Sequence, residues 1–248
     1  MIPGFHGVRE AITGGHTRIK EIWVAEGKKT LRTGEILQIA KEKNIPVIIK
    51  KNEELSRSLP GISHQGIVAL VEGFSYCELS RLTDTRPRSQ ALLIALDHIT
   101  DEGNMGAIIR TAVFFRANGL IIPKDRSAGI TANVVKRSSG AWMHLPIARV
   151  VNLGRALDTL NKNGYWIIGT SGEGRESIYN FDWNRDIVLV LGNEQKGLSQ
   201  SVGKRCHEIV GIPVSGPAES LNVSVACGVI LSEVTRQRKA EELESRKA

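Results

Sequence analysis

Residues 187–199 read IVLVLGNEQKGLS, and this stretch decides the fold that the sequence predicts. The run Ile187–Leu191 is apolar at every position and is followed at Gly192 by a polar loop. A strand with this composition is typical of a parallel sheet that helices cover on both faces. In open α/β sheets, ligands bind where such strands end. We therefore expect an α/β domain with a binding loop that begins at Gly192.

Similar runs lie on both sides of this stretch, and helical patterns separate them. The expected strands cover residues 91–96, 119–122, 166–170 and 209–213. This alternation predicts a parallel-sheet domain over residues 91–248.

The amino-terminal part repeats the alternation on a smaller scale. Expected strands at 22–24, 46–49 and 66–71 surround a helical run at 36–43. Residues 1–75 are therefore predicted to form a small α/β unit, and the polar residues 76–90 are predicted to be a linker.

Composition excludes several classes of protein. The 248 residues are 41% hydrophobic and 24% charged, which is typical of a globular protein. The longest apolar runs are far shorter than the roughly 20 residues of a membrane helix, and no secretory signal precedes them. The three cysteines form no CxxC pair, so we expect reduced thiols, no metal site and a cytoplasmic protein. The formal net charge of +7 favours anionic partners.

A second informative stretch, residues 96–112, reads LDHITDEGNMGAIIRTA. It predicts a strand, a polar turn and a helix whose apolar face is formed by Met105, Ile108, Ile109 and Ala112. Asn104 stands where a helix cap belongs, and Arg110 by itself is typical of a solvated surface charge. His98 stands alone in the sequence and is expected to be structural. From Asn104 to Gly140 six bases oppose the single acid Asp125, which predicts a local basic surface.

A third stretch, residues 209–226, reads IVGIPVSGPAESLNVSVA. A strand ends in a loop rich in proline and glycine, and Ser220 or Asn222 then begins an amphipathic helix. All three stretches thus predict polar loops at the ends of strands.

The three stretches together resemble a known family. The patterns NxGAIxRT at 104–111, LGNEQKGL at 191–198 and IPxSGxxxSLNVSVA at 212–226 are similar, in order and spacing, to the signature motifs of the SpoU (TrmH) family of RNA ribose 2′-O-methyltransferases. The segments beginning at Gly4 and His64 resemble the ribosomal-protein-like substrate-binding domain of many members.

The resemblance implies a homodimer of SPOUT-class chains, each with a deep trefoil knot in its carboxy-terminal domain. It also implies S-adenosylmethionine as methyl donor, held by Thr170, Gly192, Ile212 and Leu221. The implied catalytic residues are Arg110, Asn104, Glu194, Ser220 and Asn222. Because a guanidinium does not readily lose its proton, we expect Arg110 to bind a phosphate beside the target ribose. Glu194 or that phosphate would accept the proton.

The implied substrate is a guanosine ribose in 23S rRNA, with neither DNA nor a membrane as partner. Three alternatives stay open: methylation of tRNA, methylation of another rRNA site, and a catalytically silent factor that binds RNA or assists ribosome assembly. The presence of all three motifs argues against the silent factor.

Overall fold

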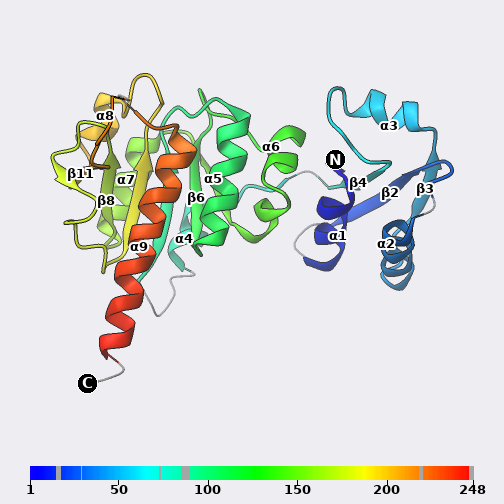
Figure 1. The fold of residues 1–248 in the computed structure, drawn as a ribbon, viewed down its shortest axis with the longest axis horizontal. Helices are drawn as coiled ribbons and strands as arrows, with labels where there is room; N and C mark the ends of the chain where they lie inside the picture. The colour runs from blue at the N-terminus through cyan, green and yellow to red at the C-terminus, as the bar shows by residue number, and fades with distance from the viewer. Residues whose placement is uncertain (15–17, 29, 73, 85–89, 218–219, 246–248) are drawn as a thin grey trace. The chain divides into compact units, whose positions relative to one another are not determined.

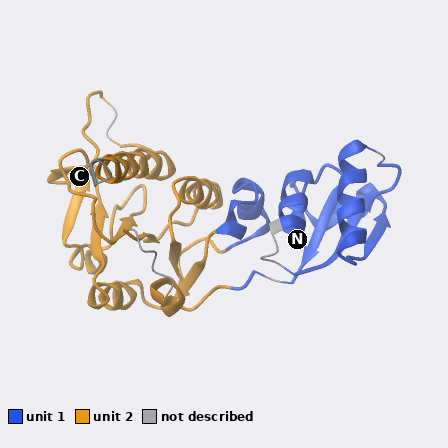
Figure 2. Ribbon diagram, turned by 90° about the horizontal axis from the view of Figure 1, so that it is seen from below, with its two compact units in different colours: residues 1–75, 130–144 blue, residues 76–129, 145–248 orange. Residues whose placement is uncertain are grey.

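The computed structural model describes residues 1–14, 18–28, 30–72, 74–84, 90–217 and 220–245 (Figure 1). It divides into two compact units (Figure 2). Unit 1 contains Met1–Ser75 and Ile130–His144, and unit 2 contains Tyr76–Gly129 and Leu145–Ala248. Within the described ranges, each helix is too short or too polar to span a lipid bilayer.

Unit 2 is built on the parallel sheet that the sequence predicts. Its seven strands have the order β7-β6-β5-β10-β8-β11-β9 and are paired in parallel throughout. The strands are β5 (Leu92–Leu96), β6 (Gly119–Pro123), β7 (Ile147–Val150), β8 (Trp166–Thr170), β9 (Glu176–Ser177), β10 (Ile187–Leu191) and β11 (Glu208–Gly211). The sequence interpretation missed β7 and β9. Strand β7 lies at the edge of the sheet and contains the exposed Arg149, so it lacks a continuous apolar run.

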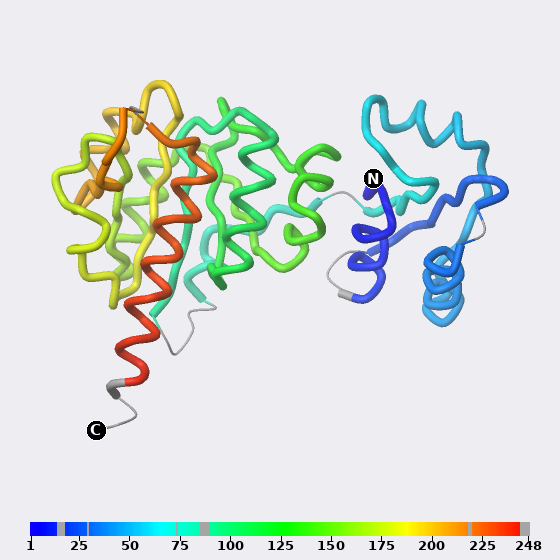
Figure 3. The backbone as a smooth tube through the Cα atoms, viewed as in Figure 1, coloured from blue at the N-terminus to red at the C-terminus, as the bar shows by residue number. Residues whose placement is uncertain are grey.

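Helices cover both faces of this sheet. Strand residues Leu93 and Val188 pack in one cluster with Leu157 and Leu160 of α7. Alternate strand residues point to the opposite face, where α5 and α9 lie side by side (Figures 1 and 3). The helices of unit 2 are α4 (Leu79–Asp84), α5 (Glu102–Phe114), α7 (Leu153–Lys162), α8 (Gln200–Gly203) and α9 (Val223–Ser245).

Unit 1 is a smaller α/β unit, as expected. Its four strands have the order β1-β4-β2-β3, with β3 parallel to β2 and the other pairs antiparallel. They are β1 (Ile2–Pro3), β2 (Ile19–Ala25), β3 (Val47–Lys50) and β4 (Ile67–Val71). The helices are α1 (Phe5–Gly14), α2 (Leu31–Glu42), α3 (Asn52–Ser58), α6 (Ala132–Arg137) and the 3-10 helix η1 (Ala141–His144).

The two segments that carry the resemblance in unit 1 lie against each other. The N–H of Gly4 donates to the carbonyl of Ile67 at 3.0 Å, and His64 is buried three residues before Ile67. Nδ1 of His64 accepts from the N–H of Gly66 at 3.1 Å, which leaves Nε2 to donate to Ser56 Oγ at 3.0 Å. Burial lowers the pKa of His64, which agrees with this neutral form. These residues therefore fix the entry of β4.

The boundary between the predicted domains contains more structure than a free linker. Leu82 of α4 is buried in the core of unit 2, within the segment 76–90 that is predicted to be a linker. Residues 85–89 lie outside the described residues. The segment Ile130–His144 of the predicted domain 91–248 groups with unit 1. The proposed boundaries 1–75, 76–90 and 91–248 stay a prediction.

The central position of β10 predicts the effect of a core substitution. Leu189 is fully buried, whereas Leu243 on α9 is 59% exposed. Leu189→Ala should lower the free energy of unfolding of unit 2 by about 2–5 kcal/mol because it leaves a cavity. Leu243→Ala should change it by less than about 0.5 kcal/mol. Urea unfolding followed by tryptophan fluorescence measures both, and equal losses would contradict the packing described here.

Candidate active site

The carboxyl ends of β5, β8, β10 and β11 meet at one edge of the unit 2 sheet. Strand β10 lies between β5 and β8. On one side of it lie β5, β6 and β7, and on the other side lie β8, β11 and β9. Such a switch in strand order is where α/β sheets bind ligands. A cavity of about 680 Å³ opens at this edge. Six predicted site residues line it: Thr170, Gly192, Glu194, Ile212, Ser220 and Leu221.

A chain of side-chain hydrogen bonds joins the three motifs beside this cavity. Nδ2 of Asn104 donates to Oε1 of Glu194. Oδ1 of the same Asn104 accepts from Nδ2 of Asn222 at 2.9 Å. These contacts connect residues 90 and 118 positions apart in the sequence. Asn104 therefore lies between the other two residues and uses both ends of its amide.

The ends of two helices set these side chains in place. Asp101 caps α5 because its side chain accepts from the N–H of Asn104 at 2.7 Å. The interpretation of Asn104 as the cap is therefore wrong, and its own amide is free to reach Glu194. Asn222 immediately precedes α9, and its Oδ1 accepts from the N–H of Ser224 at 2.9 Å and from its hydroxyl at 2.6 Å. This arrangement is typical of a helix cap.

Arg110 is not part of this chain of hydrogen bonds. It lies on α5, about 9 Å beyond Asn104 along the helix axis at the usual rise per residue. Its side chain is exposed, and it has no hydrogen-bond or ion-pair partner among the residues that the structure describes. The guanidinium is therefore free to bind an anion from outside the chain.

The cavity has the features of a nucleoside site. A Cβ at Gly192 would lie 2.5 Å from the carbonyl carbon of Gly197 and 2.6 Å from the nitrogen of Leu198, so no side chain fits there. Glycine at this position therefore lets the returning loop pack directly against the end of β10. Leu221 and Ile212 provide apolar contact area, while Thr170 uses its hydroxyl to bond the carbonyl of Val190 at 3.1 Å. Main-chain polar groups beside apolar surface fit the adenosine part of S-adenosylmethionine.

The loop after β10 is closed on itself. Asn193 and Gly197 exchange two backbone hydrogen bonds of 3.0 and 2.8 Å. Oδ1 of Asn193 also accepts from the N–H groups of Gln195 and Lys196 at 3.0 and 3.2 Å. Gly197 has φ +63°, a conformation that favours glycine. Glu194 is therefore presented by a rigid turn.

Asp97 and His98 form a second cluster that the sequence analysis missed. The Asp97 side chain is buried, and its Oδ2 accepts from the N–H of Ser199 at 2.7 Å. Its Oδ1 accepts from Nδ1 of His98 at 2.5 Å. His98 therefore has a carboxylate partner, and its structural role stays a prediction. The available signal was an acid directly after the buried run that ends at Leu96.

The predicted basic surface is divided between the units. Arg110, Arg116, Lys124 and Arg126 belong to unit 2, whereas Lys136 and Arg137 belong to unit 1. All six side chains are exposed, but their union into one surface stays a prediction.

Thiol and metal chemistry have little support at this edge. All three cysteines are free, and burial raises the pKa of Cys227 in α9 to about 12. Such a thiol stays protonated at neutral pH and is a poor nucleophile. In the described part of the chain, no three His, Cys, Asp or Glu side chains are grouped to hold a metal ion.

Two family descriptions cover most of the chain. Residues 91–232 match the SpoU rRNA Methylase family, and residues 1–77 match the domain described as RNA 2'-O ribose methyltransferase substrate binding. The first match contains all three motifs.

Individual relatives agree with these matches. The 23S rRNA (guanosine-2'-O-)-methyltransferase of Pseudomonas putida is 37% identical over 246 residues, 97% of each chain. The enzyme of the same name from Coxiella burnetii is 39% identical over 241 residues, 96% of each chain.

A solved structure extends the comparison to the cofactor. The SpoU methyltransferase AviRb from Streptomyces viridochromogenes, in complex with AdoMet, has a TM-score of 0.82 and 27% identity. The match covers 96% of this chain and 90% of that one. From the motifs, the fold and these relatives together, the chain belongs to the SpoU rRNA methylase family and is an RNA 2′-O-methyltransferase that uses S-adenosylmethionine.

Proposed function

We propose that this chain methylates the ribose 2′-hydroxyl of a guanosine in 23S rRNA. The observation that carries the proposal is the hydrogen-bonded chain from Glu194 through Asn104 to Asn222 beside the cavity. A catalytically silent RNA-binding factor has no need of this arrangement. The choice of substrate is supported by the names of the relatives from Pseudomonas putida and Coxiella burnetii.

Deleting the gene should remove one ribose-methylated guanosine from 23S rRNA, and restoring the gene should bring it back. Mass spectrometry of nuclease-digested rRNA and tRNA from the two strains measures this. Loss of a methyl group from tRNA instead would favour the tRNA alternative. An unchanged set of ribose methyl groups in both RNAs would favour the silent factor.

The cofactor would be held mainly by main-chain groups. When bound, S-adenosylmethionine supplies a methyl group already activated by its sulfonium. Gly192, Ile212 and Leu221 would bind the adenosine part, with Thr170 beside it. Because the donor is activated, the remaining task of the protein is to align the ribose oxygen and to remove its proton.

The side chains of the three motifs divide this task. Asn104, Ser220 and Asn222 would orient the ribose. Arg110 would bind the adjacent phosphate and stabilise the negative charge that develops on the 2′-oxygen. The proton would pass to Glu194 or to that phosphate. Asn104 donates to Oε1 of Glu194, so Oε2 is the oxygen that would take the proton.

Substitution of Arg110 tests its role. Arg110→Ala should leave S-adenosylmethionine binding unchanged and lower methyl transfer by about 100- to 1000-fold, the usual effect of losing a charge-stabilising donor. Arg110→Lys should also be impaired, because an ammonium lacks the planar pair of donors. Calorimetry measures cofactor binding, and single-turnover assays on rRNA from the deletion strain measure transfer. Near-normal transfer by Arg110→Lys would overturn the paired contact.

Other parts of the proposal rest on the resemblance to the family. We infer that the loops that follow β10 and β11 belong to a deep trefoil knot, and that the enzyme works as a homodimer in the cytoplasm. Phe114 on α5 is 79% exposed in the single chain, which supports an apolar contact with a second copy.

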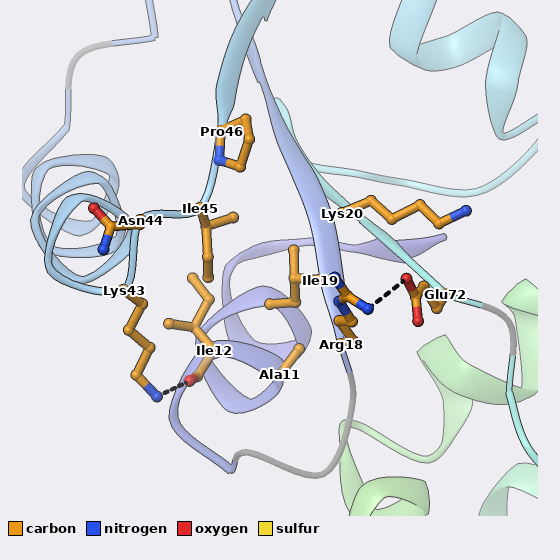
Figure 4. A pocket seen from close by; sticks show the side chains of 10 residues that line it. All are labelled: Ala11, Ile12, Arg18, Ile19, Lys20, Lys43, Asn44, Ile45, Pro46 and Glu72. Atoms are coloured by element: carbon orange, nitrogen blue, oxygen red, sulfur yellow. Dashed lines mark hydrogen bonds and ion pairs between the residues drawn. The ribbon is translucent and has the colours of Figure 1, made fainter.

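The small amino-terminal domain would recruit the RNA, and one groove in unit 1 suits this role. The groove has a volume of about 590 Å³ and is lined by Arg18, Lys20 and Lys43, with Glu72 as its single acid (Figure 4). Lys43 donates to the carbonyl of Ile12 at 2.5 Å on one side, and Arg18 faces Glu72 at 3.5 Å on the other. A mainly basic rim favours a phosphate backbone.

Charge removal in this groove should weaken RNA binding. The double variant Arg18→Ala/Lys20→Ala should bind rRNA more weakly and lower the salt slope by about 1 for each lost contact. A matched control, Lys51→Ala/Arg57→Ala, removes the same charge from exposed positions near α3 of the same unit. Fluorescence anisotropy at several salt concentrations measures both. Equal weakening of RNA binding in both double variants would indicate a response to net charge alone. Unchanged RNA binding by Arg18→Ala/Lys20→Ala would exclude the groove as an RNA-binding surface.

A further inference from the structure

We propose that Asp97 is a positioning residue for methyl transfer: its buried carboxylate holds the loop 193–199 in the conformation that presents Glu194 and the main chain of Gly192. The inference rests on the proposed function of this site. None of the three motifs includes Asp97, which follows the last residue of β5.

Both ends of the loop are attached to the corner formed by Asp97 and His98. At the start of the loop, Nδ2 of Asn193 donates to the carbonyl of His98 at 3.0 Å. At its end, the N–H of Ser199 donates to Oδ2 of Asp97 at 2.7 Å. The N–H of Asp97 also donates to the carbonyl of Leu191 at 2.8 Å, which holds the end of β10. The corner therefore fixes where the loop leaves the sheet and where it returns.

The loop transmits this attachment to the site because it is closed on itself. The two backbone bonds between Asn193 and Gly197 make the intervening turn move as one body. Glu194 lies in that turn and reaches Asn104, which is seven residues after Asp97. A displacement at Ser199 therefore changes the position of Glu194 relative to Asn104.

The chemistry of the corner suits a carboxylate. The Asp97 residue is only 1% exposed, and a buried carboxylate is tolerated when donors satisfy it. Ser199 provides a backbone N–H and His98 provides Nδ1–H, one for each oxygen. An asparagine at this position has one acceptor oxygen. If that oxygen stays on the N–H of Ser199, the NH₂ group faces His98, which must then change to the tautomer whose Nδ1 accepts. His98 also has φ +62°, an uncommon conformation for a residue other than glycine, which the paired contacts hold in place.

A second carboxylate offers a matched control for a merely structural role. Oδ1 of Asp186 accepts from the N–H of Ala91 at 2.5 Å. This bond also joins the β5 and β10 segments, but at the amino-terminal end of both strands. Asp186→Asn keeps an acceptor oxygen for Ala91 but removes the charge that acts on Arg238, so it perturbs the same two strands at the end away from the cavity.

The experiment compares Asp97→Asn with Asp186→Asn in the full chain. Urea midpoints report stability, calorimetry reports the Kd for S-adenosylmethionine, and assays on rRNA from the deletion strain report kcat and KM. Asp97→Asn should weaken cofactor binding and lower kcat by about 10- to 100-fold each, as small misplacements of reacting groups do. Asp186→Asn should lower stability and leave the Kd and kcat within about twofold of the unaltered enzyme, since it leaves the positions of the reacting groups unchanged. Equal stability losses with unchanged Kd and kcat in both variants would overturn the proposal.

A further variant tests the same contact in case Asp97→Asn does not fold. Ser199 has φ −62°, which proline can adopt, so Ser199→Pro removes the N–H, and its ring displaces the Asp97 carboxylate from that position. It should reproduce the weaker cofactor binding, and unchanged binding would contradict the role of this bond. The cofactor Kd does not depend on which RNA is methylated. Failure of the unaltered enzyme to methylate 23S rRNA would therefore count against the proposed function, not against this inference.

Discussion

The pairing of β10 with β5 on one side and β8 on the other is the constraint on which the site depends. In-register parallel pairing, with Val188 opposite both Leu93 and Ile167, makes the three strands end at one level. The loops that follow them must then share one edge. Because the central strands are apolar on both faces, they can place polar residues beside one another only where they end. The packing of the sheet thus places the candidate active site at the carboxyl-terminal edge of its strands.

At that edge, amide and carboxylate side chains form two separate sets of hydrogen bonds. Asn104 joins Glu194 to Asn222, so the start of α5, the loop after β10 and the residue before α9 share one set of hydrogen bonds. Asp97 is buried, and its carboxylate accepts from the N–H of Ser199 at the end of the loop 193–199. Arg110 is left outside both arrangements and faces solvent. Only Asp97 of these residues is buried, whereas Glu194 and Asn222 are exposed like Arg110. The site therefore opens to solvent, which suits the proposed role of receiving a polyanionic RNA.

Much of the fold could be predicted from local patterns. The strands at β5 and β10 are apolar at every position, and each begins and ends within one residue of its expected bounds. Strand β7 escaped the prediction because Arg149 interrupts its short apolar run at the edge of the sheet. The cap of α5 was assigned to Asn104, although Asp101 is an equally good capping residue three positions earlier. Local propensity cannot choose between two such neighbours, since the choice depends on what else each side chain can reach.

The sequence by itself determined the parallel α/β class, the three motif loops and, through resemblance to a family, the reaction and the cofactor. These depend on periodicity and on residue identity within short windows. Only the tertiary structure decided that Asn104 bonds both Glu194 and Asn222 and that Asp97 accepts from Ser199. It also decided that Arg110 has no hydrogen-bond or ion-pair partner within the described ranges. Those contacts join residues about 90 to 118 positions apart in the chain. They exist because the order of the strands brings distant loops together, and no local pattern encodes that order.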